Sequence, residues 1–209
     1  MKIGITGANG FIGWHLRCYL KTRNDVEEVR LAGRDVFQSH EKLVEFVDGV
    51  DAIVHLAGVN RAEPKELVEG NAEPAAQLVQ ALEQVGNKPF LVYTTSTQAV
   101  TASNPYGEGK AAVSKTFQTW ATNSDARFVN FIVPHVFGEY GRPNYNSVVA
   151  TFTHQIAAGE VPSVHNDGQL ELVHVQDLVE QIINLYEQGA SGDVRVEGRA
   201  TGVIEVAEQ

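Results

Sequence analysis

Ser96, Tyr106 and Lys110 are the residues of this 209-residue chain whose types and spacing most clearly suggest chemistry. Tyr106 and Lys110 are four residues apart, so on a helix both project from one face. A phenol has a pKa near ~10, and a nearby lysine cation favours its ionised form. The Ser96 hydroxyl could bond the same reacting oxygen. We therefore expect proton transfer at a substrate oxygen; the alternative is a surface pair at a helix start after Pro105.

A glycine-rich turn near the N-terminus predicts what else this site binds. Gly7, Gly10 and Gly13 follow the apolar run Ile3–Ile5 and precede an amphipathic helical pattern. Glycines at this spacing allow a tight turn, close approach of backbone to phosphate, and close packing of helix on strand. The helix N-terminus then offers free N–H groups to an anion. The turn predicts a site for a dinucleotide pyrophosphate, and the alternative is an ordinary glycine-rich turn.

The rest of the chain alternates short β-branched runs with helical patterns. Strands are expected at residues 2–6, 29–32, 51–56, 89–94 and 127–133, and helices near 11–22, 40–48, 64–86, 105–123 and 147–158. Ser96 falls just past the strand at 90–93. Such alternation is typical of an α/β protein with helices on both faces of a parallel sheet. We expect a Rossmann-type, doubly wound fold.

The domain organisation is expected to be simple. Residues 1–209 are predicted to form a single domain, with a dinucleotide-binding core at 1–135 and a mixed core and substrate-binding part at 136–209. Only sixteen residues separate Arg34 from Asp51, so the sheet should be short at that edge. The end, 202–209, resembles the opening of a helix, which fits a truncated chain and a native helical end equally well.

Composition restricts the partners. The formal charge is −10, which disfavours nucleic acid and anionic membranes and leaves a small molecule. No apolar run is long enough to span a membrane, and no secretory signal is evident. A single cysteine, Cys18, fits a reducing cytoplasm. The seven histidines have no paired spacing, so no metal site is expected.

Several motifs together resemble one family. The segments Gly7–Gly13, Asp51–Gly58 and Tyr106–Lys110, together with Ser96, are similar to the extended short-chain dehydrogenase/reductases of the epimerase/dehydratase group. The segments Gly58–Arg61, Asn104–Glu108 and Arg142–Val148 resemble the reductase domain of bifunctional capsular-polysaccharide enzymes. Those enzymes reduce a 4-keto-6-deoxy UDP-sugar with NADPH.

The resemblance assigns roles residue by residue. Ser96, Tyr106 and Lys110 are implied to be catalytic. The implied cofactor-binding residues are Gly7, Asn9, Gly10, Phe11, Ile12, Gly13, Arg34, Leu56, Ala57, Gly58, Asn71, Tyr106, Lys110, Pro134 and Val136. The implied substrate-binding residues are Asn60, Arg61, His135, Arg142, Asn144, Asn146 and Ser147. For Asn71 a helix-surface amide is an equal alternative, and for the segment 144–147 the alternative is a helix N-cap.

Arg34 bears on which nicotinamide cofactor is used. Relatives that use NAD usually carry an acid at the end of the second strand, where this chain has Gly33 followed by Arg34. A guanidinium matches a 2′-phosphate, so NADP(H) is favoured over NAD(H). An exposed loop arginine is the alternative, and the neighbouring Asp35 argues against a strong preference.

Departures from the family pattern narrow the reaction. Thr97 and Gln98 follow Ser96 where dehydratases have an acid, which disfavours 4,6-dehydration. His135 replaces a common asparagine and is either a substrate contact or a packed core histidine. Residues 167–171 lack the arginine that relatives direct at the UDP pyrophosphate, and Arg61 or Arg142 could replace it.

These observations give one leading hypothesis and two alternatives. The leading hypothesis is a cytoplasmic, NADP(H)-dependent oxidoreductase that reduces a 4-keto-6-deoxy UDP-sugar for polysaccharide synthesis. The alternatives are an NAD-dependent nucleotide-sugar 4-epimerase and a non-catalytic NAD(P)-binding sensor. By resemblance alone, a homodimer is possible.

Overall fold

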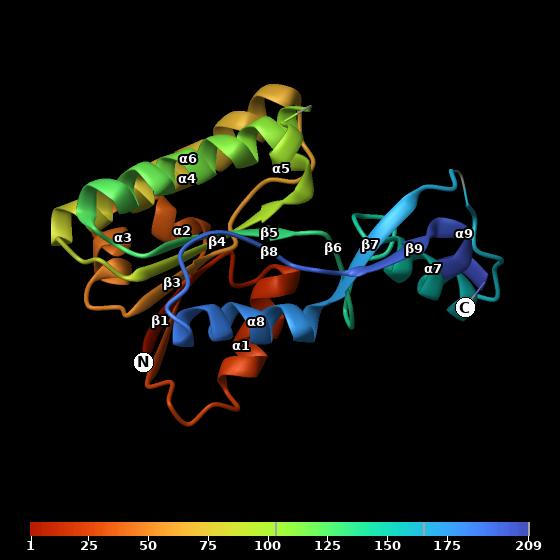
Figure 1. Cartoon of the computed structure of the whole chain (residues 1–209), viewed down its shortest axis with the longest axis horizontal. Coiled ribbons are helices and arrows are strands. Elements are labelled where there is room, and N and C mark those ends of the chain that lie inside the picture. The colour runs from red at the N-terminus through yellow and green to blue at the C-terminus, as the bar shows by residue number, and fades with distance from the viewer. Residues whose placement is uncertain (103, 165, 209) are drawn as a thin grey trace.

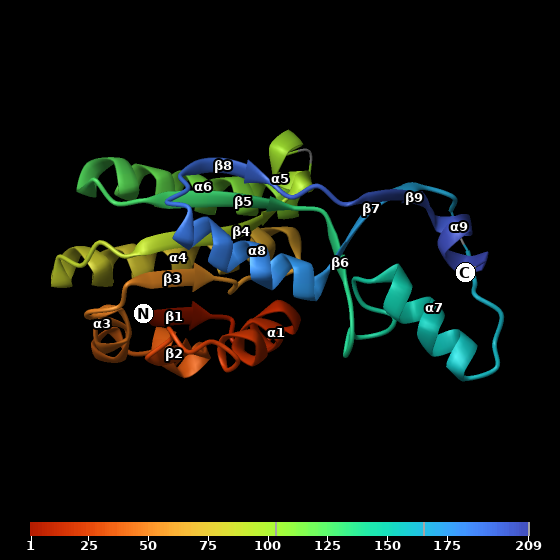
Figure 2. The same cartoon turned by 60° about the horizontal axis from the view of Figure 1, so that its bottom comes forward.

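Six strands pair in parallel into one sheet in the order β2-β1-β3-β4-β5-β8 (Figures 1 and 2). The computed structural model describes residues 1–102, 104–164 and 166–208. The six strands are β1 (Lys2–Thr6), β2 (Glu28–Ala32), β3 (Ala52–His55), β4 (Phe90–Ser96), β5 (Phe128–Val133) and β8 (Gly192–Arg195). The inner strands are almost continuously buried, as expected for a parallel sheet covered on both faces.

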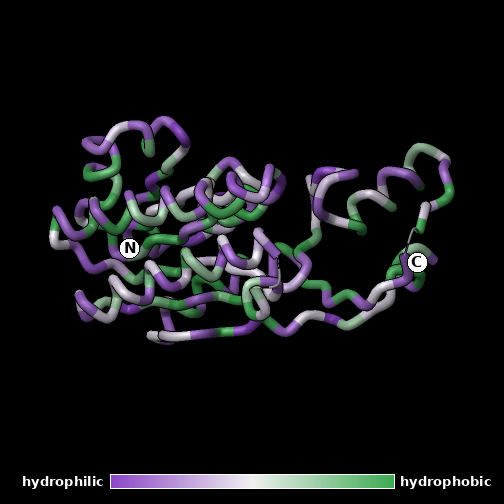
Figure 3. The backbone as a smooth tube through the Cα atoms, turned by 90° about the horizontal axis from the view of Figure 1, so that it is seen from above, coloured by the Kyte–Doolittle hydropathy of each residue, from purple (hydrophilic) through white to green (hydrophobic). Residues whose placement is uncertain are grey.

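Helices cover the two faces of this sheet and close two apolar cores. On one face lie α1 (Phe11–Leu20) and α8 (Val175–Glu187), and on the other lie α3 (His40–Val47), α4 (Pro64–Val85) and α6 (Pro105–Ser124) (Figures 1 and 2). Two short helices, α2 (Arg34–Phe37) and α5 (Thr97–Thr101), follow β2 and β4 directly. In Figure 3, hydrophobic stretches run through the interior of this larger body and hydrophilic ones through its periphery.

Helix caps set where the functional residues fall. Asn104 accepts a hydrogen bond from the Gly107 backbone N–H at 2.8 Å, and Pro105 follows as the first helical residue. This cap places position 106 in the first turn of α6 and position 110 in the next. Gly86, in the left-handed region at φ 70°, ends α4.

A second, smaller sheet stands beside the first (Figure 2). It has the order β6-β7-β9 and consists of β6 (His135–Phe137), β7 (Gln169–His174) and β9 (Arg199–Gly202). Two helices, α7 (Val148–Ala157) and α9 (Val203–Glu208), accompany it. This part borders the carboxyl ends of the parallel strands, where substrate-binding residues were expected.

The α/β fold and its doubly wound sheet are confirmed, and so are all five expected strands and five expected helices, with shifted ends. The short sheet edge is also confirmed: α2 and α3, and no strand among the described residues, occupy 34–51. Strand β4 is longer than expected, because its last three residues pair with β5 and carry the strand to Ser96. Helix α9 forms at the predicted C-terminal position; Gln209 lies outside the described residues. Strands β6, β7, β8 and β9 and helices α2, α5 and α8 were not predicted.

Candidate active site

A large cleft lies where the winding of the sheet reverses. From β1 the chain runs to β2 on one side and then to β3 on the other. Ligands of open α/β sheets bind beyond the carboxyl ends of the strands at this reversal. A cleft of about 1120 Å³ lies there, lined by the glycine turn after β1 and by Leu56, Ala57 and Gly58 after β3.

The glycine turn can accept a pyrophosphate. Gly7 has φ 65°, and a Cβ atom there would lie 2.7 Å from the Ala57 backbone nitrogen. At Gly13 a Cβ would come within 2.5 Å of the Gly7 oxygen, so neither glycine tolerates a side chain. Helix α1 has no side-chain cap at Gly10 and no acid in its first turn. Its first N–H groups are therefore open to an anion, and the residues present fit a dinucleotide.

Ser96 and Tyr106 meet at the wall of this cleft. Ser96 is the last residue of β4 and accepts a hydrogen bond from Gln98 N at 3.3 Å. Its side chain lies near enough to the Tyr106 hydroxyl to lower the pKa of that phenol, and both residues line the cleft. Lys110 lies one turn further along α6, only 5% exposed, with Nζ 5.9 Å from the centre of the Tyr106 ring. The three predicted residues are thus brought together, with the lysine beneath the cleft surface.

Burial dominates the ionisation of this group. It raises the pKa of Tyr106, and the nearby Ser96 hydroxyl opposes that rise. Tyr145 also raises the pKa of Tyr106. The expected lowering by Lys110 together with an oxidised nicotinamide stays a prediction. Burial also lowers the pKa of Lys110 from 10.5 to about 8. Lysine and tyrosine are thus both mostly protonated at neutral pH.

Asn71 is a buried structural residue, so the alternative of a helix-surface amide is wrong. It is 2% exposed, and its Nδ2 donates to Val59 O at 3.0 Å and to Leu67 O. Its Oδ1 accepts from Val59 N at 3.1 Å. Asn71 therefore fastens the loop after β3 to helix α4, and it is not among the residues that line the cleft.

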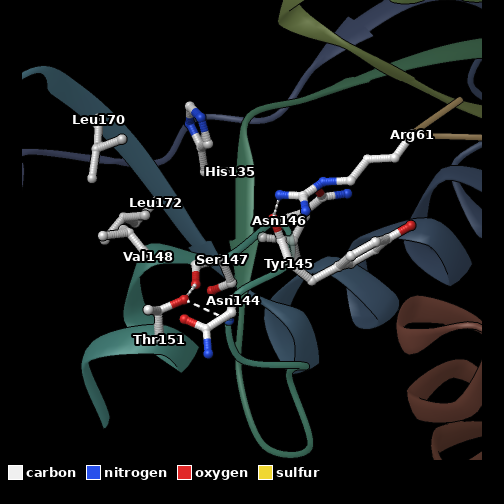
Figure 4. Close-up of a pocket in the computed structure, with 11 residues that line it drawn as sticks. Arg61, His135, Asn144, Tyr145, Asn146, Ser147, Val148, Thr151, Leu170 and Leu172 are labelled. Atoms are coloured by element: carbon white, nitrogen blue, oxygen red, sulfur yellow. Dashed lines mark hydrogen bonds between the residues drawn. The ribbon is translucent and has the colours of Figure 1, made fainter. Parts of the chain in front are cut away.

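A second cavity of about 520 Å³ adjoins the cleft on the side of the small sheet (Figure 4). Arg61, Tyr145 and Asn146 gather on one of its sides, and Leu170, Leu172 and Val148 lie on another. Arg61 Nε donates to Asn146 Oδ1 at 3.2 Å, and Arg61 Nη2 also donates to the Tyr145 carbonyl.

Tyr145 joins this cavity to the cleft, because it lines both. The guanidinium carbon of Arg61 lies 4.8 Å from the centre of its ring, and that of Arg142 lies 5.1 Å away. Two cations therefore stack on one aromatic side chain at the junction.

The charge of these two cavities is opposite to that of the chain. The formal net charge is −10, yet no aspartate or glutamate is among the described residues that line either cavity. Arg61, Arg142 and His135 are among them. Low-charge walls with a few arginines favour an anionic ligand.

Most of the implied site residues line one or both cavities. In the cleft these are Gly7, Asn9, Gly10, Phe11, Ile12, Gly13, Leu56, Ala57, Gly58, Asn60, Ser96, Tyr106, Pro134, His135, Val136, Arg142, Asn146 and Ser147. Arg61 and Asn144 line the second cavity. Arg34, Asn71 and Lys110 line neither, and Arg34 is the exposed first residue of α2. His135 is exposed, so the packed-histidine alternative is wrong. Ser147 lines the site and also caps α7 through Ala150 N.

The structure adds lining residues that were not assigned to the site from the sequence. They are Trp14, Gln98, Tyr140, Gly141 and Tyr145 in the cleft, with Val148, Thr151, Leu170 and Leu172 in the second cavity. Trp14 directly follows the third glycine of the turn, and Tyr145 lies inside the segment 142–148 that resembles the reductases. For both residues, closeness in the sequence to residues already assigned to the site could have indicated their place. Leu170 and Leu172 belong to β7, which was not predicted.

The described residues show neither a cluster that could hold a metal ion nor a helix that could span a membrane. Within residues 1–102, 104–164 and 166–208, no group of three or more His, Cys, Asp or Glu side chains is arranged to hold a metal ion. No helix in those ranges is long and apolar enough to cross a membrane.

A doubly wound sheet with this glycine turn at its switch point defines a Rossmann-type nucleotide-binding protein. The chain belongs to the NAD dependent epimerase/dehydratase family, whose model matches residues 3–197.

Relatives of two activities resemble the chain. It is 36% identical to a UDP-2-acetamido-2,6-beta-L-arabino-hexul-4-ose reductase of Pseudomonas aeruginosa, over 100% of this chain and 55% of the relative. It is 26% identical to a UDP-glucose 4-epimerase of Rickettsia typhi, over 97% of this chain and 67% of the relative. The chain thus spans about half the length of the reductase.

A solved structure is also similar to the chain. The capsular polysaccharide assembling protein CapF of Staphylococcus aureus superposes with a TM-score of 0.80 at 29% identity, over 100% of this chain and 56% of CapF.

Proposed function

We propose that this chain reduces the 4-keto group of a 6-deoxy UDP-sugar with NADPH, for polysaccharide synthesis. One observation carries the proposal: the neighbouring Ser96 and Tyr106 side chains, with Lys110 beneath them, line a cleft that fits a dinucleotide. The similarity to a hexul-4-ose reductase supports the choice of a keto sugar.

The glycine turn and the segment after β3 would hold the cofactor. Gly7, Gly10 and Gly13 leave room for its pyrophosphate, and Leu56, Ala57 and Gly58 would flank a ribose. When bound, the nicotinamide supplies a hydride to the carbonyl carbon of the sugar.

Side chains of this chain would transfer the proton to the carbonyl oxygen. Ser96 hydrogen-bonds the carbonyl oxygen and orients it, and Tyr106 donates its phenolic proton to that oxygen as the carbon gains the hydride. The product is an alcohol and a phenolate, which the Lys110 ammonium stabilises until solvent returns the proton. The raised pKa of Tyr106 keeps the phenol protonated before the reaction, which suits reduction.

The nucleotide half of the substrate would occupy the second cavity. Arg61 and Arg142, stacked on Tyr145, would face the diphosphate, and Asn144, Asn146 and Ser147 would contribute amide and hydroxyl groups. The absence of lining carboxylates in the described cavities supports an anionic substrate.

The test mixes the purified chain with NADPH and UDP-2-acetamido-2,6-beta-L-arabino-hexul-4-ose, and follows NADPH absorbance and the sugar product. We expect turnover that Tyr106→Phe reduces at least ~100-fold, in line with loss of a general acid. The matched control is Tyr186→Phe, since Tyr186 lies on α8 and does not line the cleft. Full activity of Tyr106→Phe would contradict the proposed proton donor.

A second candidate is a 4-epimerase, favoured by the similarity to UDP-glucose 4-epimerases. It predicts interconversion of UDP-hexoses with tightly held cofactor and without net NADPH consumption. The same assays with UDP-glucose and NAD distinguish the two enzymes. Binding of NADPH without turnover of either substrate would leave the sensor alternative.

A further inference from the structure

Lys110 is a buried cation with few hydrogen-bonding or charged partners among the described residues. Lys110 is 5% exposed, and among the described residues its ammonium donates one long hydrogen bond, 3.4 Å to Thr94 O. No carboxylate of the described residues forms an ion pair with it, and burial lowers its pKa to about 8. An isolated buried ammonium is costly, so another group has to keep it charged and in place.

Tyr93 supplies that group from the neighbouring strand. It lies on β4, is 1% exposed, and its ring centre is 5.0 Å from Lys110 Nζ. Cations within about 6 Å of a ring centre are attracted to its face. Lys110 therefore lies over two tyrosine rings, that of Tyr106 at 5.9 Å and that of Tyr93 nearer.

The ring of Tyr93 is what reaches Lys110, rather than its oxygen. The Thr95 side chain lies near the Tyr93 hydroxyl and opposes the rise that burial causes in the pKa of Tyr93. Among the described residues, however, neither Tyr93 Oη nor Thr95 Oγ1 has a hydrogen-bond partner. A buried hydroxyl without a partner does not stabilise the fold. Phe117 packs against the Tyr93 ring at 5.7 Å and helps to fix its orientation.

We propose that Tyr93 is a positioning residue whose ring face holds the Lys110 ammonium beneath Tyr106. Other groups near Lys110 carry no negative charge at neutral pH. His55, on β3, is buried with a pKa of about 3 and stays neutral, and Tyr106, on α6, is a protonated phenol. From α4, the neutral amide of Asn71 lies against Gly58, near which Lys110 Nζ also lies.

The substitutions that test this separate the ring from the hydroxyl. Tyr93→Leu removes the ring, and Tyr93→Phe keeps it and is the matched control. Tyr93→Met, whose longer and more flexible side chain adapts to an irregular space, serves if the leucine variant does not fold. The Cε chemical shift of isotopically labelled lysine reports the titration of Lys110 in each folded protein, and Lys110→Met identifies the signal.

We expect the Lys110 titration midpoint to fall by about one pH unit in Tyr93→Leu and to stay within a few tenths of wild type in Tyr93→Phe. The same midpoint in wild type and Tyr93→Leu, or an equal shift in both variants, overturns the proposal.

The importance of Tyr93 for catalysis rests on the proposed function, but the lysine titration needs neither cofactor nor substrate. If the chain reduces the keto sugar, the alkaline limb of kcat should shift to lower pH in Tyr93→Leu and not in Tyr93→Phe, with KM for the sugar unchanged. A titration shift without any turnover would refute the proposed function and leave the role of Tyr93 standing. An unshifted kcat limb in an active Tyr93→Leu enzyme would overturn the catalytic role.

Discussion

Gly58 faces the side-chain oxygen of Asn71 so closely that a Cβ atom at position 58 would lie 2.6 Å from Asn71 Oδ1. The same atom would be 3.3 Å from Lys110 Nζ. The wall of the cleft after β3 therefore fits against the buried amide and the buried lysine without space for a methyl group.

Gly58→Ala is expected to destabilise the protein by about 1–3 kcal/mol, because the Asn71 amide cannot move without losing its bonds to Val59. Urea denaturation measures the change. The matched control is Gly168→Ala, where a Cβ meets no atom within 4 Å, and it should cost less than about 0.5 kcal/mol. Equal stabilities of the two variants would show that the contact at Gly58 is not tight.

Asn71→Asp tests the contribution of the Asn71 amide donors to stability. The substitution removes both N–H donors, so the carbonyls of Val59 and Leu67 face a carboxylate. We expect a loss of about 3 kcal/mol at neutral pH. Burial should raise the pKa of the new carboxyl, and its protonated form regains one donor, so the loss should shrink as pH falls toward about 5. A loss that does not change between the two pH values would contradict this account.

The features that the sequence predicted are those encoded by short spacing. The glycine turn, the pair Tyr106–Lys110 and the helix start at Pro105 each lie within a few residues, so one local element determines their geometry. Strands β6, β7 and β9 depend on pairing between residues far apart, His135 with Leu172 for example, and their runs are too short to show a period.

The burial of Asn71 follows from its place in the helical pattern. It falls on the apolar stripe of α4 that includes Leu67, Ala75 and Leu78, at helical spacing of three and four. That position alone predicts burial. The raised pKa of Tyr106 could not be read from spacing, because desolvation depends on how the whole cleft packs. The single-domain organisation, the cytoplasmic location and the homodimer stay predictions.

Lys110→Met should abolish keto-sugar reduction and change the pH dependence of stability. The folded pKa of Lys110 is about 8 and its ordinary value is 10.5, so between these values the unfolded chain binds more protons. Wild-type stability therefore rises with pH across this range, and the full cost of burying the cation applies below pH 8. Relative to wild type, the variant should lose roughly 2 kcal/mol between pH 7 and 10. Urea denaturation at both pH values checks this, and a constant difference would contradict the buried charge.

Arg34 determines the cofactor preference if its guanidinium binds a 2′-phosphate. It is exposed on α2, beyond β2. Arg34→Ser should weaken NADPH binding about tenfold, the value of one charge-assisted pair, and leave NADH binding within about twofold. Calorimetric titration with each nucleotide measures both. Arg199→Ser, which removes an exposed arginine of the small sheet, controls for net charge. Equal weakening of NADPH and NADH binding, or no weakening of either, would show that Arg34 does not determine a preference for NADP(H).

His55 should make the fold sensitive to acid. The imidazole is wholly buried, Nδ1 lies 3.0 Å from Thr6 Oγ1, and burial lowers its pKa from 6.5 to about 3. Above pH 6.5 both states are neutral. As pH falls below 6.5 the unfolded chain takes up a proton that the folded chain cannot, so stability is lost.

The test is His55→Asn, whose amide can still bond Thr6. The variant should be less stable than wild type at pH 7, because the ring contact with Phe117, 5.0 Å between centres, is lost. That difference should shrink by about 3 kcal/mol at a pH near 4.5, because the variant lacks the group that titrates. His154→Asn, at an exposed position of α7, should show no such convergence. If the His55→Asn difference is equal at both pH values, the imidazole is not held neutral by burial.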